Sequence, residues 1–335
     1  MNQSAYYGHE SQLFGVEEVR LQGGKGDGMR LLQVRNGRGL EFTVSADRCA
    51  DISRLIFRGE NCGFFSANGY VAPAYYDDKE DGWLKNFTAG FLTTCGLTYM
   101  GSYCTDEGKA LGQHGLISNV PANHVGSAVR WEGDTPSIQV SGQIKQAQVF
   151  GEHLVMSRVI RLDVERNVFT IEDEIENRGL TRTPYMILYH MNYGYPMLNE
   201  GCVVEAPGGA VAGRDQHAQN GLHKWMQMEL PADDMEEQCY YHMPSADADG
   251  FATYTVSNSK LGIAVHVRYT AGTLPFLTEW KCRKSGVYAL GLEPGNARVD
   301  GRGVTREDGS LQFLELLERR FNRICVKIED LIGNP

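Results

Sequence analysis

The sequence has no apolar run of about 20 residues, the length that a helix needs to cross a bilayer. Its first residues are polar and lack a basic region followed by an apolar core, so no secretion signal is visible. Lysine and arginine number 32 against 42 acidic residues, a formal net charge of -10, and they form no basic cluster. A nucleic-acid surface needs clustered positive charge to neutralise phosphates. We therefore expect a soluble protein with neither a nucleic-acid nor a membrane partner.

The eight cysteines form no Cys-x-x-Cys pair and no Cys/His spacing typical of a zinc site. Scattered free thiols are typical of a reducing cytoplasm, although an even number leaves disulfides open. Hydrophobic residues make up 42% of the chain and charged residues 22%, which fits a globular protein with a sizeable core. No composition shift marks a linker, and no internal repeat is found. We expect a cytoplasmic protein folded as one domain over residues 1–335.

Helical periodicity is also scarce, and no convincing amphipathic helix exceeds two turns. Short stretches of alternating apolar residues, such as 40–45 and 137–144, are instead separated by turn signals. Asn36 and Gly37 predict a tight hairpin turn before the first of these strands. Short strands at steady spacing predict an all-β fold, a large antiparallel β-sandwich.

Three further stretches carry local predictions. Residues 66–83 lack a period and are rich in Tyr, Ala, Asp and Gly, so we expect a long loop whose aromatic rings either bind a ligand or pack on the core. Residues 91–99 predict a strand interrupted at Gly96, where another backbone or a ligand approaches closely. Residues 208–220 predict a polar loop.

The most informative stretch is residues 183–198, where an apolar and aromatic run predicts a buried strand that delivers His190 just before Gly194 and Pro196. Glu293 similarly follows an apolar strand and precedes Pro-Gly, and a buried carboxylate there is costly without a purpose. His114 lies between glycines, which allows a tight turn and an accessible ring. Each residue also has an interpretation without a functional role. His190 is then a hydrogen-bonded core histidine, Glu293 an exposed turn glutamate and His114 a solvated loop histidine.

Charged residues close to strands supply further candidates for ligand binding. Asp47, Arg48 and Asp51 form a cluster at a strand end, either solvated or arranged as a fixed fork for ligand hydroxyls. Lys281 follows Trp280 in a predicted strand and is an additional candidate cation for ligand binding.

Three motifs in this order resemble the galactose mutarotase (aldose 1-epimerase) superfamily: Gly-Gln-His-Gly at 112–115, Leu-Tyr-His-Met-Asn-Tyr at 188–193 and Gly-Leu-Glu-Pro-Gly at 291–295. The match is closest to an uncharacterised aldose-epimerase-like branch and covers roughly residues 16–328. The resemblance implies a β-sandwich of the supersandwich type with a carbohydrate cleft on one concave sheet, and an isomerase that acts on a sugar without metal or other cofactor.

The resemblance also implies roles for particular residues. Glu293 would be the general base that takes the proton from the anomeric hydroxyl, and His190 the general acid that protonates the ring oxygen. His114 would bind the sugar near that oxygen. Asn192 and Trp280 are also expected to contact the sugar.

Two departures from the family pattern bear on the substrate. The residue before the strand histidine is usually Asn in well-studied mutarotases and is Tyr189 here. No Asn-Arg motif precedes His114, so Arg48, with Asp47 and Asp51, is the nearest candidate for the arginine that binds substrate. An uncommon aldose, a uronic acid or another acidic sugar would suit Arg48 and Lys281 if they line the cleft.

Two other functions stay open on the sequence. The first is a non-catalytic carbohydrate-binding or sugar-sensing protein that keeps the cleft without the chemistry. The second is a metal-dependent sugar isomerase with His114, His190 and Glu293 as ligands, although these residues lack local ligand spacing such as His-x-His. The sugar, the anomer and the oligomeric state, including a homo-oligomer, are also open.

Overall fold

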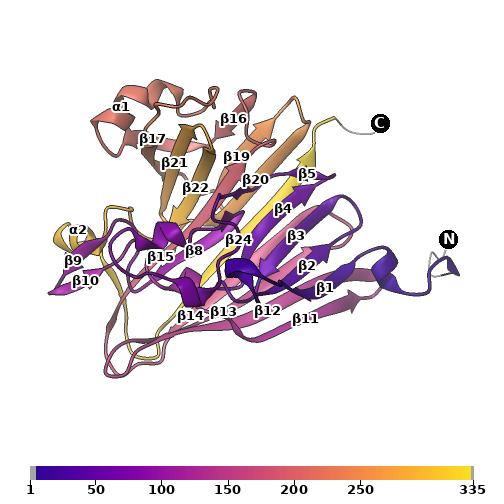
Figure 1. Cartoon of the computed structure of the whole chain (residues 1–335), viewed down its shortest axis with the longest axis horizontal. Coiled ribbons are helices and arrows are strands. Elements are labelled where there is room, and N and C mark those ends of the chain that lie inside the picture. Colours follow the sequence, from indigo (N-terminus) through magenta and orange to yellow (C-terminus); the bar gives the residue numbers. More distant parts are fainter. Residues whose placement is uncertain (1–4, 333–335) are drawn as a thin grey trace.

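A computed structural model describes residues 5–332. Two large antiparallel sheets dominate it, and they stand with a third, N-terminal sheet around a shared apolar core (Figure 1). The predicted all-β fold, a large antiparallel β-sandwich, is thereby confirmed. None of the helices within residues 5–332 is long and apolar enough to span a membrane.

The first large sheet has eight strands. In spatial order they are β11 (Asn123–Glu132), β12 (Thr135–Ala147), β13 (His153–Asp163), β14 (Val168–Asn177), β24 (Arg319–Asp330), β20 (Ile263–Thr270), β19 (Phe251–Asn258) and β16 (Cys202–Glu205). Buried and partly exposed residues alternate along β12 and β19, as expected for strands with one face on the core.

The second large sheet carries the residues of interest. Its order is β17 (Gly208–Gly213), β18 (Gln238–Pro244), β21 (Phe276–Lys284), β22 (Val287–Gly295), β15 (Thr183–Gly194) and β23 (Gln312–Leu314), and β8 (Leu92–Leu97) also pairs with β15. Almost every residue of β15 is buried, because both of its faces are covered. Tyr189 and Met191 face the main core, while Met186 and Leu188 pack in a second cluster with Trp83 and Phe87.

The N-terminal sheet consists of β1 (Gly15–Arg20), β2 (Arg30–Arg35), β3 (Leu40–Ser45), β4 (Asp51–Phe57) and β5 (Glu60–Asn61). It packs on the eight-stranded sheet, and the ring centroids of Phe42 in β3 and Phe169 in β14 are 4.9 Å apart. The predicted hairpin of β2 and β3 forms. Its connection, residues 36–39, is longer than a two-residue turn, and the Asn36 side chain accepts hydrogen bonds there from the amides of Arg38 and Leu40.

The remaining elements are short. They are the pairs β6 (Phe64–Phe65) with β7 (Ala89–Gly90) and β9 (Cys104–Asp106) with β10 (Lys109–Leu111), the helices α1 (Gln216–Gly221) and α2 (Arg302–Glu307), and the 3-10 turns η2 (Glu10–Gln12), η3 (Gly24–Gly26), η4 (Pro73–Tyr75), η5 (Gly82–Lys85), η6 (Ile117–Asn119) and η7 (Leu222–Lys224). In Figure 1, α1 lies beside β17 and α2 beside β9 and β10.

Two of the local predictions have clear outcomes. The polar loop predicted over 208–220 is wrong, because β17 pairs with β18 and Asp215 caps α1 by accepting a hydrogen bond from the amide of Ala218. The close approach predicted at Gly96 is confirmed. Its amide donates to the carbonyl of His114 at 3.1 Å, and a Cβ at Gly96 would lie 2.4 Å from the carbonyl oxygen of Met186.

Candidate functional site

The centre of the site is a cross-strand pair. Met191 pairs with Leu292 and Leu188 with Gly295, and this register puts His190 of β15 opposite Glu293 of β22. Alternation along each strand then directs both side chains away from the main core. His190 Nε2 and Glu293 Oε1 are 3.1 Å apart, and the two side chains are 6% and 2% exposed.

The contact between these atoms is close but not aligned as a hydrogen bond, since Glu293 Oε1 has no hydrogen-bond partner. The other ring nitrogen, His190 Nδ1, is also unpaired. Burial raises the pKa of the Glu293 carboxyl well above its usual range and lowers the pKa of the His190 ring well below its usual range. Both shifts have the same cause, because burial favours the uncharged forms, a protonated carboxyl and a neutral imidazole, over the charged ones.

Gly291 makes room for this pair. A Cβ at Gly291 would lie 2.4 Å from Glu293 Oε1 and 3.2 Å from His190 Cε1. Real Cβ atoms do not approach oxygen so closely, so any other residue here would displace the carboxyl. The space that Glu293 needs thus explains why a glycine stands in the middle of β22.

His114 comes from a loop between β10 and η6 and reaches the same place. Its φ is +57°, a left-handed conformation that is uncommon for a residue with a side chain. The loop is held by hydrogen bonds from the His114 amide to the Gly101 carbonyl and from the Tyr76 hydroxyl to the Gly115 carbonyl. The rings of His114 and His190 are 5.6 Å apart between centroids. Burial lowers the pKa of His114 to about 4, so its ring is neutral, and its Nδ1 has no partner.

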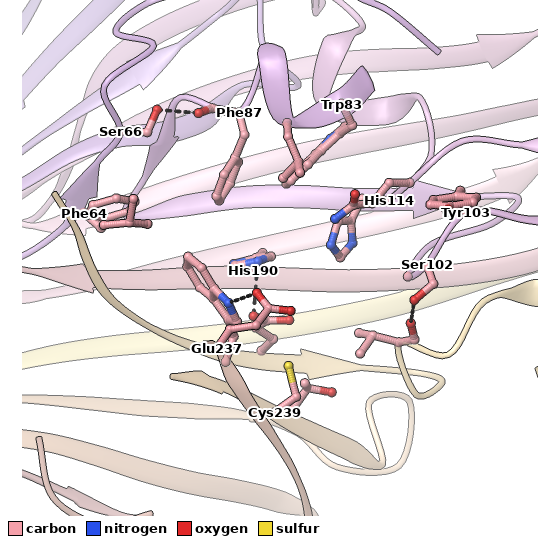
Figure 2. Close-up of a pocket in the computed structure, with 18 of the residues that line it drawn as sticks. Phe64, Ser66, Trp83, Phe87, Ser102, Tyr103, His114, His190, Glu237 and Cys239 are labelled. Atoms are coloured by element: carbon pink, nitrogen blue, oxygen red, sulfur yellow. Dashed lines mark hydrogen bonds and ion pairs between the residues drawn. The ribbon is translucent and has the colours of Figure 1, made fainter. Parts of the chain in front are cut away.

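The three residues line one cavity of about 520 Å3. In Figure 2, Trp83 and Phe87 lie on one side of the cavity and Glu237 and Cys239 on the other, with His114 and His190 between them. Trp83 stacks on Phe87 at 4.4 Å between ring centroids. These aromatic walls give the cavity flat apolar surfaces next to its few polar groups.

Trp280 also lines the cavity, and its indole Nε1 donates a 2.7 Å hydrogen bond to Glu237 Oε2. Arg214 Nη2 donates to the other oxygen of Glu237 at 3.4 Å. Arg214 and Glu237 are two lining residues that the sequence did not single out. Arg214 follows directly after β17, in the stretch predicted as a loop, and no local pattern separates it from other surface charges.

The mouth of the cavity is mixed, because exposed polar residues such as Asn68 and Ser102 line it together with apolar ones. Leu84, Tyr103 and Val287 line the cavity and are 48%, 56% and 39% exposed. The aromatic loop predicted over 66–83 supplies the wall residue Trp83, while its Tyr70 packs on Phe65 instead.

The charged residues proposed from the sequence lie elsewhere. The guanidinium of Arg48 is buried and donates to the backbone carbonyls of Ser118, Val71 and Asn86. The carboxylate of Asp47 accepts a hydrogen bond from the amide of Arg30.

Asp51 forms a buried ion pair with Arg158 at 2.6 Å, and Arg158 also pairs with Asp173 at 2.7 Å. Lys281 alternates with Trp280 and points to the opposite face of the sheet, where its ammonium donates to the carbonyls of Lys224 and Gln227. None of Asp47, Arg48, Asp51 and Lys281 lines the cavity.

Asn192 stands behind His190 rather than on the cavity wall. It is fully buried, and its Nδ2 donates to the carbonyl of His190 at 2.9 Å. The bond fixes the backbone from which the imidazole projects. Within residues 5–332, no group of three or more His, Cys, Asp or Glu is arranged to hold a metal ion.

Comparisons with solved structures agree with this architecture. A candidate aldose 1-epimerase from Klebsiella pneumoniae superposes with a TM-score of 0.89 at 25% identity, over 95% of this chain and 86% of that chain. A galactose mutarotase-like protein from Clostridium acetobutylicum gives 0.67 at 11% identity, over 95% and 99%. A galactose 1-epimerase from Lactobacillus acidophilus gives a TM-score of 0.59 at 11% identity, over 95% of this chain and 99% of that chain.

The two more distant structures show the fold alone. Among curated proteins, none matches this chain. A family model described as a domain of unknown function, DUF4432, matches residues 26–328. This match covers most of the sequence, and the chain therefore belongs to the DUF4432 family, with a galactose mutarotase-like fold.

Proposed function

We propose that this protein is a sugar mutarotase or a closely related epimerase, which interconverts the anomers of an aldose by ring opening without a cofactor. The observation that carries the proposal is the buried pair of His190 and Glu293, 3.1 Å apart, in one cavity with His114. The likeness to the candidate aldose 1-epimerase from Klebsiella pneumoniae supports the same reaction class.

The reaction needs one group that removes a proton and one that supplies a proton. Glu293 takes the proton from the anomeric O1 hydroxyl, and the O1 electron pair forms the carbonyl. The C1–O5 bond breaks, and its electron pair goes to O5, which receives a proton from His190. Rotation about the C1–C2 bond and closure by the reverse transfers give the other anomer. No atom is gained or lost, and no redox step occurs.

The number of protons that His190 and Glu293 hold together suits these transfers, which we call the proton relay. Burial favours a resting state in which Glu293 carries the proton and the His190 ring is neutral. Moving that proton across to His190 gives a carboxylate base and an imidazolium acid, the two forms that the reaction uses. Resting and reactive states hold the same number of protons, so solvent does not have to supply one during turnover.

The rest of the cavity binds the sugar. The unpaired Nδ1 of His114 meets a sugar oxygen near the ring, and Trp83, Phe87 and Trp280 cover the C–H faces of the ring. Arg214 and Glu237 exchange hydrogen bonds with sugar hydroxyls farther from C1.

The charge balance favours a neutral aldose. Among the described residues that line the cavity, Arg214 is the one lysine or arginine, and Glu237 already neutralises it. Because Arg48 and Lys281 lie outside the cavity, an acidic sugar would have to compete with Glu237 for Arg214. We therefore place neutral aldoses ahead of uronic acids.

The test follows anomer exchange by NMR with freshly dissolved single-anomer aldoses and uronates. Wild-type protein should accelerate exchange for at least one neutral aldose, and Glu293→Gln should reduce that rate about 10²-fold or more, the usual contribution of acid-base catalysis. Failure of the wild type on the whole panel, or a Glu293→Gln rate equal to wild type, refutes the proposal.

A second candidate is a carbohydrate-binding or sugar-sensing protein on the same fold. The aromatic walls and the Arg214–Glu237 pair favour it, because they can hold a sugar whether or not the proton relay operates. Calorimetric binding that survives His190→Asn with Glu293→Gln, together with no turnover by the wild type, would select this candidate.

A further inference from the structure

Thr278 of β21 has a buried hydroxyl that no protein group satisfies. The residue is 1% exposed, it lines the cavity, and its Oγ1 has no hydrogen-bond partner. Buried polar groups in folded proteins are nearly always paired, so an orphan hydroxyl needs an explanation.

The other serine and threonine hydroxyls of the cavity are paired. Ser66 Oγ donates to the carbonyl of Phe87, and Ser102 Oγ donates to the carbonyl of Val299. The remaining unpaired buried atoms of the cavity include His114 Nδ1, His190 Nδ1 and Glu293 Oε1. Thr278 therefore shares its unpaired state with the residues proposed to handle the sugar.

The register of the sheet places Thr278 beside Glu293. The two residues are directly opposed on the antiparallel strands β21 and β22, so their side chains lie on the same face. A sugar whose O1 hydroxyl meets the Glu293 carboxylate consequently brings O1 next to Thr278 as well.

We infer that Thr278 is a further catalytic residue, whose hydroxyl donates a hydrogen bond to the anomeric oxygen O1 of the sugar. This inference rests on the proposed mutarotase function. When Glu293 removes the O1 proton, negative charge develops on O1 before the C1–O5 bond has fully broken. A donor already aimed at that oxygen stabilises the charge without reorganising at the moment of reaction. Thr278 keeps its own proton throughout.

The experiment compares Thr278→Val, which removes the hydroxyl at nearly constant shape, with Thr278→Ser, which keeps it. We expect the kcat of anomer exchange to fall about 10²-fold in Thr278→Val, as when one oxyanion donor is removed, and to recover largely in Thr278→Ser. The Tm of ligand-free Thr278→Val should not fall, because the lost hydroxyl has no partner in the folded protein.

Thr183→Val is the matched control. Thr183 is a buried threonine at the start of β15, outside the cavity, and its Oγ1 donates to the carbonyl of Thr181. This variant should lose Tm but keep the wild-type rate, the reverse of Thr278→Val.

Three outcomes overturn the inference. An active wild type with Thr278→Val at the same rate removes it and leaves the proposed function intact. If Thr278→Val loses Tm and Thr278→Ser is as slow as Thr278→Val, the residue has a packing role instead. A wild type without turnover on any sugar removes the proposed function and this inference together.

Discussion

Replacing Gly291 with alanine tests whether the space beside Glu293 is part of the site. The new Cβ would lie 2.4 Å from Glu293 Oε1 and 3.2 Å from His190 Cε1. An ordinary carbon–oxygen contact is longer by about 1 Å. The carboxyl must therefore move by about that distance, away from the position that the relay requires.

The expected loss follows from that displacement. Misplacing a catalytic group by about 1 Å can cost about 10²-fold in rate, and overpacking a buried site costs about 1–3 kcal/mol of stability. We expect Gly291→Ala to show both effects, with kcat reduced more than sugar affinity. The rate is measured by anomer exchange, the affinity by calorimetry and the stability by urea unfolding.

Gly126→Ala is the control for Gly291→Ala. Gly126 lies in a strand, β11, and a Cβ there would meet nothing within 4 Å. It should leave both rate and stability close to wild type. A Gly291→Ala protein with wild-type rate and wild-type stability would show that Glu293 does not occupy the position described, and the reasoning would fail.

The remaining predictions concern the buried charges. Asp51→Ala should lower the free energy of unfolding by about 3–5 kcal/mol, because it removes one partner of the buried Arg158. The rate of anomer exchange per folded molecule should stay unchanged. Unchanged stability with a raised KM would instead show that Asp51 binds the substrate. The free energy of unfolding should fall as pH drops from about 6.5 to about 4, since unfolded chains protonate His114 there and the folded ring does not, and His114→Gln should remove one proton from that slope. A slope equal in both proteins would place that proton elsewhere. The kcat/KM should be flat across neutral pH, because the low pKa of His190 and the high pKa of Glu293 keep one proton on the pair there; a sharp maximum near pH 6.5 would mean that His190 titrates normally.

The strands, and the meeting of His114, His190 and Glu293 in one cavity, were easier to predict from the sequence than the partners of the charged residues. The apolar run before His190 identified β15, and the motif order linked His190 to His114 and Glu293. Alternation identified strands with one face on the core, such as β12, because the burial of such strands has a period of two that is visible in one chain.

The partners of the charges could not be predicted, because they depend on which strands become neighbours. Arg48 and Asp51 looked like a ligand fork but satisfy backbone carbonyls and the buried Arg158, which lies about a hundred residues away in sequence. Lys281 is one residue from Trp280, yet alternation sends it to the other face. Arg214 lines the cavity without any local signal.

The most direct test of the central claim is a double-mutant cycle on the His190–Glu293 pair, read as the rate of anomer exchange. The cycle uses His190→Asn, Glu293→Gln and the combined variant. If the two residues form one proton relay, removing either disables it, so the double variant should be about as slow as the slower single variant. Losses that multiply, with the double variant slower than either single variant by the product of their effects, would mean that the residues act independently and would contradict the relay.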